Sequence, residues 1–230
     1  MTVNPVRTFA FVDISGFTAL TEAHGDEEAV ATLARFREIT HAALAPSDIL
    51  VKTIGDAVML AFSQPAHAVL ALRRLFEGAS ADPSMPLVRA GAHHGSAIAD
   101  DDDFFGSTVN LAARVAAYAG GGQLLVTEHV ALTATDTGEI VTHVGAMSLR
   151  NIAEPVDLYE IDLNPGANTA IDPVCAMKVA TSGASTVHLR HDDRDVWFCG
   201  LPCLSRYAAS PDSFARPTDT GISPLRDPSG

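Results

Sequence analysis

The sequence is poor in the features that mark secreted and membrane proteins. It has three cysteines in 230 residues and only two lysines, Lys52 and Lys178, so arginine supplies nearly all of its positive charge. No apolar run is long enough to span a bilayer, and the N-terminus lacks the charged, apolar and small-residue regions of a signal peptide. We therefore expect a cytoplasmic protein.

The chain also lacks the positive charge of a nucleic-acid-binding protein. Its formal net charge of -13 would repel nucleic acid and anionic membranes, so we expect neither as a partner. An anionic substrate would need bound cations. No GxxxxGK[ST] motif is present, which argues against a P-loop nucleotidase.

The apolar and polar patterns predict an α+β fold. Strands alternate with helices, but a Gly55-Asp56 hairpin interrupts the alternation, which favours a mixed sheet with helices packed on it. We expect strands at residues 7–13, 49–62 (as a hairpin), 87–94 and 123–127, with two or three more between 139 and 161. We expect helices at residues 16–44 (divided at Gly25), 66–78 and 107–118, the last capped by Ser107.

Composition divides the chain into a large and a small part. Residues 5–162 form the first domain, and the Asn, Pro and Gly residues within 163–170 indicate a linker. A short cysteine-containing segment follows at 171–216. The tail, residues 217–230, is rich in Pro, Asp, Ser and Thr and is predicted to be disordered.

Two aspartates follow apolar runs and are candidate metal ligands. Asp13 ends the first predicted strand, and Asp56 lies in the hairpin turn. Paired carboxylates suit a divalent ion that binds phosphate. Taken singly, Asp13 could instead cap the next helix, and Asp56 could be an ordinary turn residue.

Four segments together resemble the catalytic domain of class III adenylyl and guanylyl cyclases. They are residues 11–18 (FVDISGFT), 52–56 (KTIGD), 88–95 (VRAGAHHG) and 103–114 (DFFGSTVNLAAR). The resemblance covers roughly residues 5–162 and implies the ferredoxin-like mixed sheet of that family.

The resemblance implies a two-metal site. Asp13 and Asp56, with the backbone carbonyl of Ile14, would bind two Mg²⁺ or Mn²⁺ ions. The amides of Gly16, Phe17 and Thr18, at a helix start, would bind triphosphate oxygens.

The resemblance places Lys52 and Asp103 at the base-recognition positions. A lysine donates and an aspartate accepts, which matches N1 and N6 of adenine and mismatches guanine. Lys52 could otherwise be a surface strand lysine, and Asp103 belongs to an acidic run, residues 100–103, of the kind that is usually a solvated loop.

Asn110 and Arg114 lie four residues apart and would share one helix face. By resemblance, Asn110 orients the ribose and Arg114 binds the α-phosphate in the transition state. Arg114 could instead be a surface arginine. In this family the metal-binding and base-binding residues of one site come from different subunits, which implies a homodimer. We expect no catalytic role for His93 or His94.

The C-terminal segment resembles a YHS domain, which is related to TRASH-type metal-binding fingers. The resemblance rests on residues 172–179 (DPVCAMKV) and 197–203 (WFCGLPC), with Ala176 where glycine is usual. Cys175, Cys199 and Cys203 would bind Zn²⁺ or another thiophilic ion such as Cu(I), with His188, His191 or solvent as the fourth ligand. The cysteines could instead simply pack in a small core.

The sequence therefore predicts an adenylate cyclase that converts ATP to 3',5'-cyclic AMP and pyrophosphate. The alternatives are a guanylate cyclase and a non-catalytic nucleotide- or metal-binding module. We expect no N-terminal sensor domain, so the C-terminal segment would be the part of the chain that regulates activity, through its metal.

Overall fold

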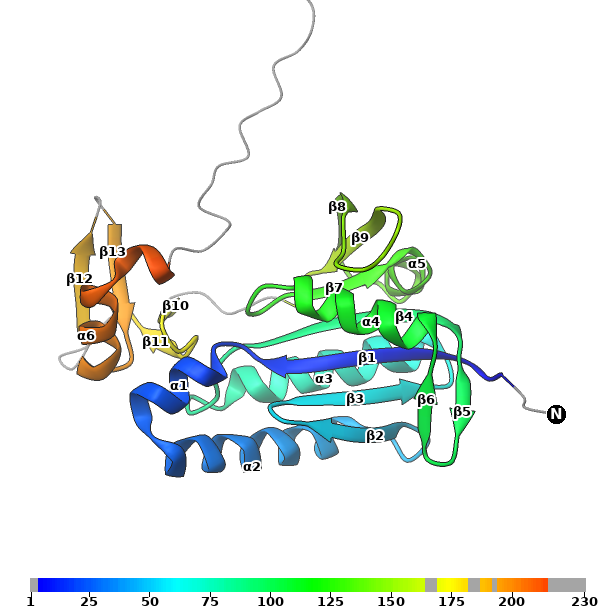
Figure 1. Cartoon of the computed structure of the whole chain (residues 1–230), viewed down its shortest axis with the longest axis horizontal. Coiled ribbons are helices and arrows are strands. Elements are labelled where there is room, and N and C mark those ends of the chain that lie inside the picture. The colour runs from blue at the N-terminus through cyan, green and yellow to red at the C-terminus, as the bar shows by residue number, and fades with distance from the viewer. Residues whose placement is uncertain (1–3, 164–168, 182–186, 192–193, 215–230) are drawn as a thin grey trace, which may run out of the picture.

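A seven-stranded mixed sheet forms the centre of the computed structural model, which describes residues 4–163, 169–181, 187–191 and 194–214 (Figure 1). We call residues 4–163 the sheet domain and residues 169–214 the C-terminal module. The strand order is β2-β3-β1-β4-β7-β9-β8. The strands are β1 (Val6–Ile14), β2 (Ile49–Ile54), β3 (Ala57–Phe62), β4 (Val88–Ser96), β7 (Leu124–Thr127), β8 (Val141–Met147) and β9 (Val156–Ile161).

The first four strands have the β-α-β-β-α-β connection of ferredoxin-like folds. β1 pairs antiparallel with both β3 and β4, whereas β4 and β7 run parallel. The predicted α+β class with a mixed sheet is therefore confirmed.

Helices cover both faces of the sheet (Figure 1). They are α1 (Phe17–His24), α2 (Asp26–Ala43), α3 (Pro65–Ala81), α4 (Ser107–Tyr118) and α5 (Glu128–Asp136). Side chains alternate along β1: Ala10 and Val12 join the core that includes residues of α2 and α3, while Phe9 lies in the cluster that includes residues of α4. The two faces of β1 therefore belong to two different cores.

A glycine lets α4 approach the sheet closely. A β-carbon added at Gly91 on β4 would lie 2.0 Å from the backbone nitrogen of Ala116 on α4. The helix carrying two predicted site residues, Asn110 and Arg114, is therefore held at a distance that only glycine permits.

Most predicted elements are present, with three differences. The helix α5 and the small hairpin of β5 (Ile98–Asp100) and β6 (Asp103–Phe105) were missed, because short elements give little periodic signal. The predicted cap of α4 was wrong: Ser107 is the first helical residue, Gly106 holds the cap position, and no side chain caps the helix.

The C-terminal module lies against the α1 end of the sheet domain (Figure 1). It contains two small hairpins, a helix and a 3₁₀ turn. These elements are β10 (Thr169–Ile171), β11 (Lys178–Ala180), β12 (Val187–His191), β13 (Arg194–Phe198), α6 (Leu201–Ala209) and η1 (Pro211–Phe214). Its core, which includes Val174, Phe198 and Tyr207, continues into the sheet domain through Leu20 and Ala29.

Within the described residues, every helix is too short or too polar to cross a membrane. Most of the predicted linker, residues 164–168, and the predicted tail lie outside the described residues.

Candidate active site and metal centre

The structure brings Asp13 and Asp56 to the same edge of the sheet. Asp13 pairs with Ala57 across β1 and β3, and the amide of Ile14 donates to the carbonyl of Asp56 at 3.3 Å. Burial raises the pKa of the Asp56 carboxyl, and the nearby charge of Asp13 raises it further. Two carboxylates in partial burial concentrate negative charge where a cation can bind.

Arg89 supplies the counter-charge in this structure. Its Nε and Nη2 donate to Oδ2 of Asp13 at 2.8 Å and 2.5 Å. Arg89 stands opposite Asp13 in the β1–β4 pairing. Arg89 lies within the third cyclase-like segment, but its pairing with Asp13 joins strands far apart in the chain, so the segment alone does not predict it.

Asp13 does not cap the following helix, which was the alternative to a metal role. The cap residue of α1 is Gly16, with φ of 73°, and no side chain bonds to the helix start. Phe17 and Thr18 begin the helix, so their amides are among those without a partner inside it. The turn therefore offers backbone donors beside two carboxylates.

Lys52 and Asp103 form an ion pair, with 2.5 Å between Nζ and Oδ2. The hydrogen bond from Lys52 lowers the pKa of the Asp103 carboxyl, and the amide of Phe104 donates to its other oxygen at 2.8 Å. The acidic run forms the turn between β5 and β6, and Asp103 is its residue that pairs with Lys52. This pairing distinguishes Asp103 from the other residues of the acidic run.

Asn110 and Arg114 both lie on α4, and Asn110 is far from Asp13. The start of α4 lies over one end of β4, because a β-carbon on Gly95 would meet Thr108. The last turns of α4 lie over Gly91. Gly95 is six residues along β4 from Arg89, the partner of Asp13. Six strand residues span roughly 20 Å. Asn110 is exposed near the distant end, two residues after Thr108.

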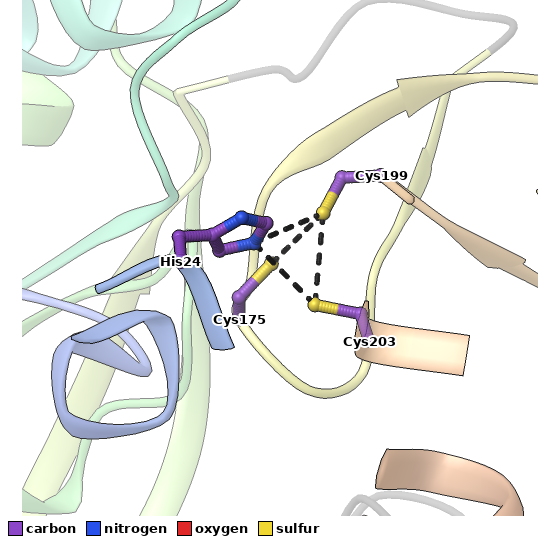
Figure 2. Close-up of side chains that lie close together, drawn as sticks. All are labelled: His24, Cys175, Cys199 and Cys203. Atoms are coloured by element: carbon purple, nitrogen blue, oxygen red, sulfur yellow. Dashed lines mark hydrogen bonds between the residues drawn. The ribbon is translucent and has the colours of Figure 1, made fainter. Parts of the chain in front are cut away.

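The three cysteines converge with a histidine that sequence analysis did not consider. Cys199 Sγ lies 3.5 Å from Cys175 Sγ and 3.6 Å from Cys203 Sγ, and His24 Nε2 lies 3.4 Å from Cys199 Sγ (Figure 2). The four ligand atoms lie within 4.8 Å of one another. The cysteines are free thiols.

His188 and His191, two of the predicted candidates for a fourth ligand besides solvent, do not lie in the cysteine cluster. His188 stacks on Trp197 with 4.8 Å between ring centroids, and His191 packs edge-on against Tyr207. The histidine beside the three cysteines is His24, the last residue of α1. No local pattern marks His24, which lies about 150 residues before the first cysteine, so only the folded chain reveals it.

A ferredoxin-like sheet that carries paired acidic turns and a Lys–Asp pair defines a nucleotidyl cyclase domain. The family model of the adenylate and guanylate cyclase catalytic domain matches residues 3–162, and the chain belongs to this family. The C-terminal module lies beyond the matched residues.

Relatives agree with this assignment. The chain is 35% identical over 158 residues to a pH-sensitive adenylate cyclase of Mycobacterium tuberculosis, covering 67% of this chain and 40% of the relative. It thus spans about two fifths of that relative's length. An adenylate cyclase structure from Trypanosoma brucei, described in its monomeric state, matches with a TM-score of 0.61 and 27% identity, over 70% of this chain and 91% of that one. The adenylyl cyclase CyaB of P. aeruginosa has the same fold, with a TM-score of 0.62 at 20% identity over 70% and 96% of the two chains.

Proposed function

We propose that the protein is an adenylate cyclase that converts ATP to 3',5'-cyclic AMP and pyrophosphate. The observation that carries the choice of ATP is the ion pair of Lys52 and Asp103. Lysine offers only donors and an ionised aspartate only acceptors, so the pair complements N1 and N6 of adenine. Guanine would face donor against donor and acceptor against acceptor.

The donor set beside β1 fits hard divalent cations. Asp13, Asp56 and the carbonyl of Ile14 offer oxygen ligands, which Mg²⁺ and Mn²⁺ prefer. When bound there, two such ions would lower the pKa of the ribose 3'-hydroxyl and neutralise the β- and γ-phosphates. Arg89 holds one oxygen of Asp13, so it keeps the carboxylate in place and balances its charge.

The remaining residues position the nucleotide. The amides of Gly16, Phe17 and Thr18 bind triphosphate oxygens at the positive end of α1. Asn110 orients the ribose, and the Arg114 guanidinium stabilises negative charge on the α-phosphate as the 3'-oxygen attacks and pyrophosphate leaves.

We further propose that each site is shared between two copies of the chain. Within one chain Asn110 lies far along the sheet from Asp13, whereas the ribose and α-phosphate must adjoin the metal-binding carboxylates. A head-to-tail dimer would bring the α4 residues of one copy to the Asp13 turn of the other. Ile98 and Phe105, paired on the hairpin beside Lys52, are 49% and 47% exposed and offer apolar surface for such contact.

The test is to incubate the purified full chain with ATP or GTP and with Mg²⁺ or Mn²⁺, and to quantify both cyclic nucleotides. We expect cyclic AMP, and we expect Asp13→Ala to abolish it while the fold is retained. Cyclic GMP as the main product would reject the base assignment. No cyclic product under any condition would reject the enzyme.

A further inference from the structure

We propose that His24, Cys175, Cys199 and Cys203 form one tetrahedral zinc-type site that fastens the C-terminal module to the sheet domain beside the catalytic turn. The new element is the ligand from the sheet domain: His24 ends α1, and the three thiols come from the module (Figure 2). A metal held by all four would therefore join two parts of the chain.

The distances fit a four-coordinate ion. Ligands at about 2.3 Å for sulfur and 2.0 Å for nitrogen around a tetrahedral zinc ion lie about 3.5–3.8 Å from each other. Four of the six separations are 3.5 Å and 3.6 Å between sulfurs, and 3.4 Å and 3.6 Å from His24 Nε2 to Cys199 and Cys203, and all six are within 4.8 Å. They are also too long for a disulfide, whose sulfurs lie about 2.05 Å apart.

The chemistry of the ligands selects the class of metal. Three thiolates and one imidazole are a usual ligand set for structural Zn²⁺, whereas Mg²⁺ and Mn²⁺ prefer oxygen. The site therefore takes a different ion from the one proposed at Asp13 and Asp56. Binding displaces the thiol protons, so it is favoured by higher pH.

A buried carboxylate holds the cysteine-bearing segments in place. Asp172, 0% exposed, accepts hydrogen bonds from the amides of Val174 and Cys199, each at 2.8 Å. It thereby fixes the turn before Cys175 to the segment that carries Cys199. Ligands prearranged in this way need little reorganisation to bind an ion.

Packing alone joins the module to the sheet domain only in part. Leu20 and Ala29 pack into the module core, and Arg206 of α6 pairs with Glu22 of α1. A cavity of about 390 Å³ lies between the two parts, lined from both sides by residues that include Gly16, Leu87 and Phe214. A small core with an incomplete interface is where a metal crosslink contributes most.

The contact leads directly to the catalytic turn. The Leu87 amide donates to the Ala176 carbonyl at 2.9 Å, and the Ser15 amide donates to the Leu87 carbonyl at 2.8 Å. Ser15 lies between Ile14 and Gly16. A β-carbon on Gly16 would lie 3.1 Å from the Cys175 backbone. The module thus contacts Gly16 directly and Ser15 through Leu87. Ser15 is the residue after Ile14, whose carbonyl is a proposed metal ligand.

The metal therefore acts as a positioning element for the cyclase site. With the ion bound, His24 and Cys175 hold the module against α1 and keep the turn of Ser15 and Gly16 ordered. Without it, we expect the module to separate more readily, so that the Leu87 amide loses its Ala176 partner and Gly16 loses its contact with the Cys175 backbone. This effect on turnover rests on the proposed cyclase function, whereas metal binding does not.

Metal binding is tested on the purified full chain by elemental analysis and by reconstitution with Co²⁺, whose visible bands report tetrahedral coordination and thiolate ligation. We expect one Zn²⁺ or Co²⁺ per chain. His24→Ala should weaken Co²⁺ affinity at least about tenfold and alter the bands. His24→Cys should keep four ligands and bind Co²⁺ with a spectrum shifted toward four thiolates.

His188→Ala is the matched control, since it removes an exposed module histidine outside the cluster. It should leave affinity and spectrum unchanged. A His24→Ala variant with unaltered affinity and spectrum, or a wild-type chain that binds no Co²⁺ through its thiols, would overturn the proposal. The His24→Cys variant separates loss of a ligand from loss of folding.

Docking is tested by hydrogen exchange with and without a chelator. We expect metal removal to speed exchange of the Leu87 amide, which bonds to Ala176 of the module, at least about tenfold, while amides in the centre of β1 stay protected. Equal exchange in both states would refute the fastening role. Cyclic AMP production, assayed with excess Mg²⁺ after the chelator has been removed by dialysis, should be lower than before chelation and should return when Zn²⁺ is restored. If the chain makes no cyclic nucleotide at all, the binding and exchange measurements still decide the site.

Discussion

Lys52 Nζ and Asp103 Oδ2 lie 2.5 Å apart, although 51 residues separate them in the sequence. The bond places one donor and one acceptor side by side at the rim of the sheet, beside the ring of Phe105. Each group satisfies the other, and under the proposed function this pair would recognise adenine.

Exchanging this pair should change the base. We predict that Lys52→Glu combined with Asp103→Ser shifts the ratio of kcat/KM for ATP over GTP by at least about 100-fold toward GTP, because the new pair would mismatch adenine. The measurement is cyclic AMP and cyclic GMP formation at matched substrate concentrations. A double variant that keeps the wild-type preference would contradict the assignment of these residues.

Two inactive variants should restore activity together. Under the proposed function, Asp13→Ala removes a metal ligand and Arg114→Ala removes the phosphate-binding arginine, so a homodimer of either variant should be inactive. Random mixing makes half of the dimers mixed, each with one intact site, and we expect about a quarter of wild-type activity. Mixing Asp13→Ala with Asp56→Ala is the control, since both changes fall in the same half-site. Recovery in the control, or none in the test, would refute shared sites.

Glycine at position 91 should be essential for the placement of α4. We predict that Gly91→Ala lowers the free energy of unfolding by about 1–3 kcal/mol or more, because its β-carbon would overlap the backbone of Ala116. Gly120→Ala is the control: its β-carbon would meet only the movable end of Gln123 at 3.1 Å. Urea unfolding measures both, and equal stabilities would contradict the close contact.

Stability should fall in acid through His93. Burial, with the neighbouring charges of His94 and His129, lowers the pKa of His93 from 6.5 to about 4. In the unfolded chain His93 binds a proton below about pH 6.5, whereas in the folded chain it does so only below about pH 4. The free energy of unfolding is therefore highest above pH 6.5 and decreases as the pH falls from about 6.5 to about 4. The slope is at most one proton, or about 1.4 kcal/mol per pH unit.

His93→Asn tests this, because asparagine can still bond to Thr127 Oγ1, which lies 2.7 Å from His93 Nδ1, and does not titrate. The variant should lose less stability than the wild type between pH 6.5 and pH 4 in urea unfolding. Because His94 also has a lowered pKa, the slope should become smaller and not vanish. Parallel curves for the two proteins would contradict the assignment.

Local patterns determined the sheet domain because its elements are long and strongly periodic. The strands β1 and β3 contain continuous apolar runs, as expected for strands buried on both faces, whereas α3 repeats its apolar residues at the helical period and buries one side. The short β5–β6 hairpin escaped prediction because it buries little, and the acidic run that forms its turn has the composition of an ordinary loop.

The sequence by itself determined the family, the two acidic turns and the candidate residues Lys52, Asn110 and Arg114, since these lie in contiguous motifs. Only the tertiary structure decided that Arg89 balances Asp13 and that His24 joins the three cysteines. The physical reason is the same in both cases. Both contacts join residues that are far apart in the chain. They form only when the strands have paired and the module has packed on α1.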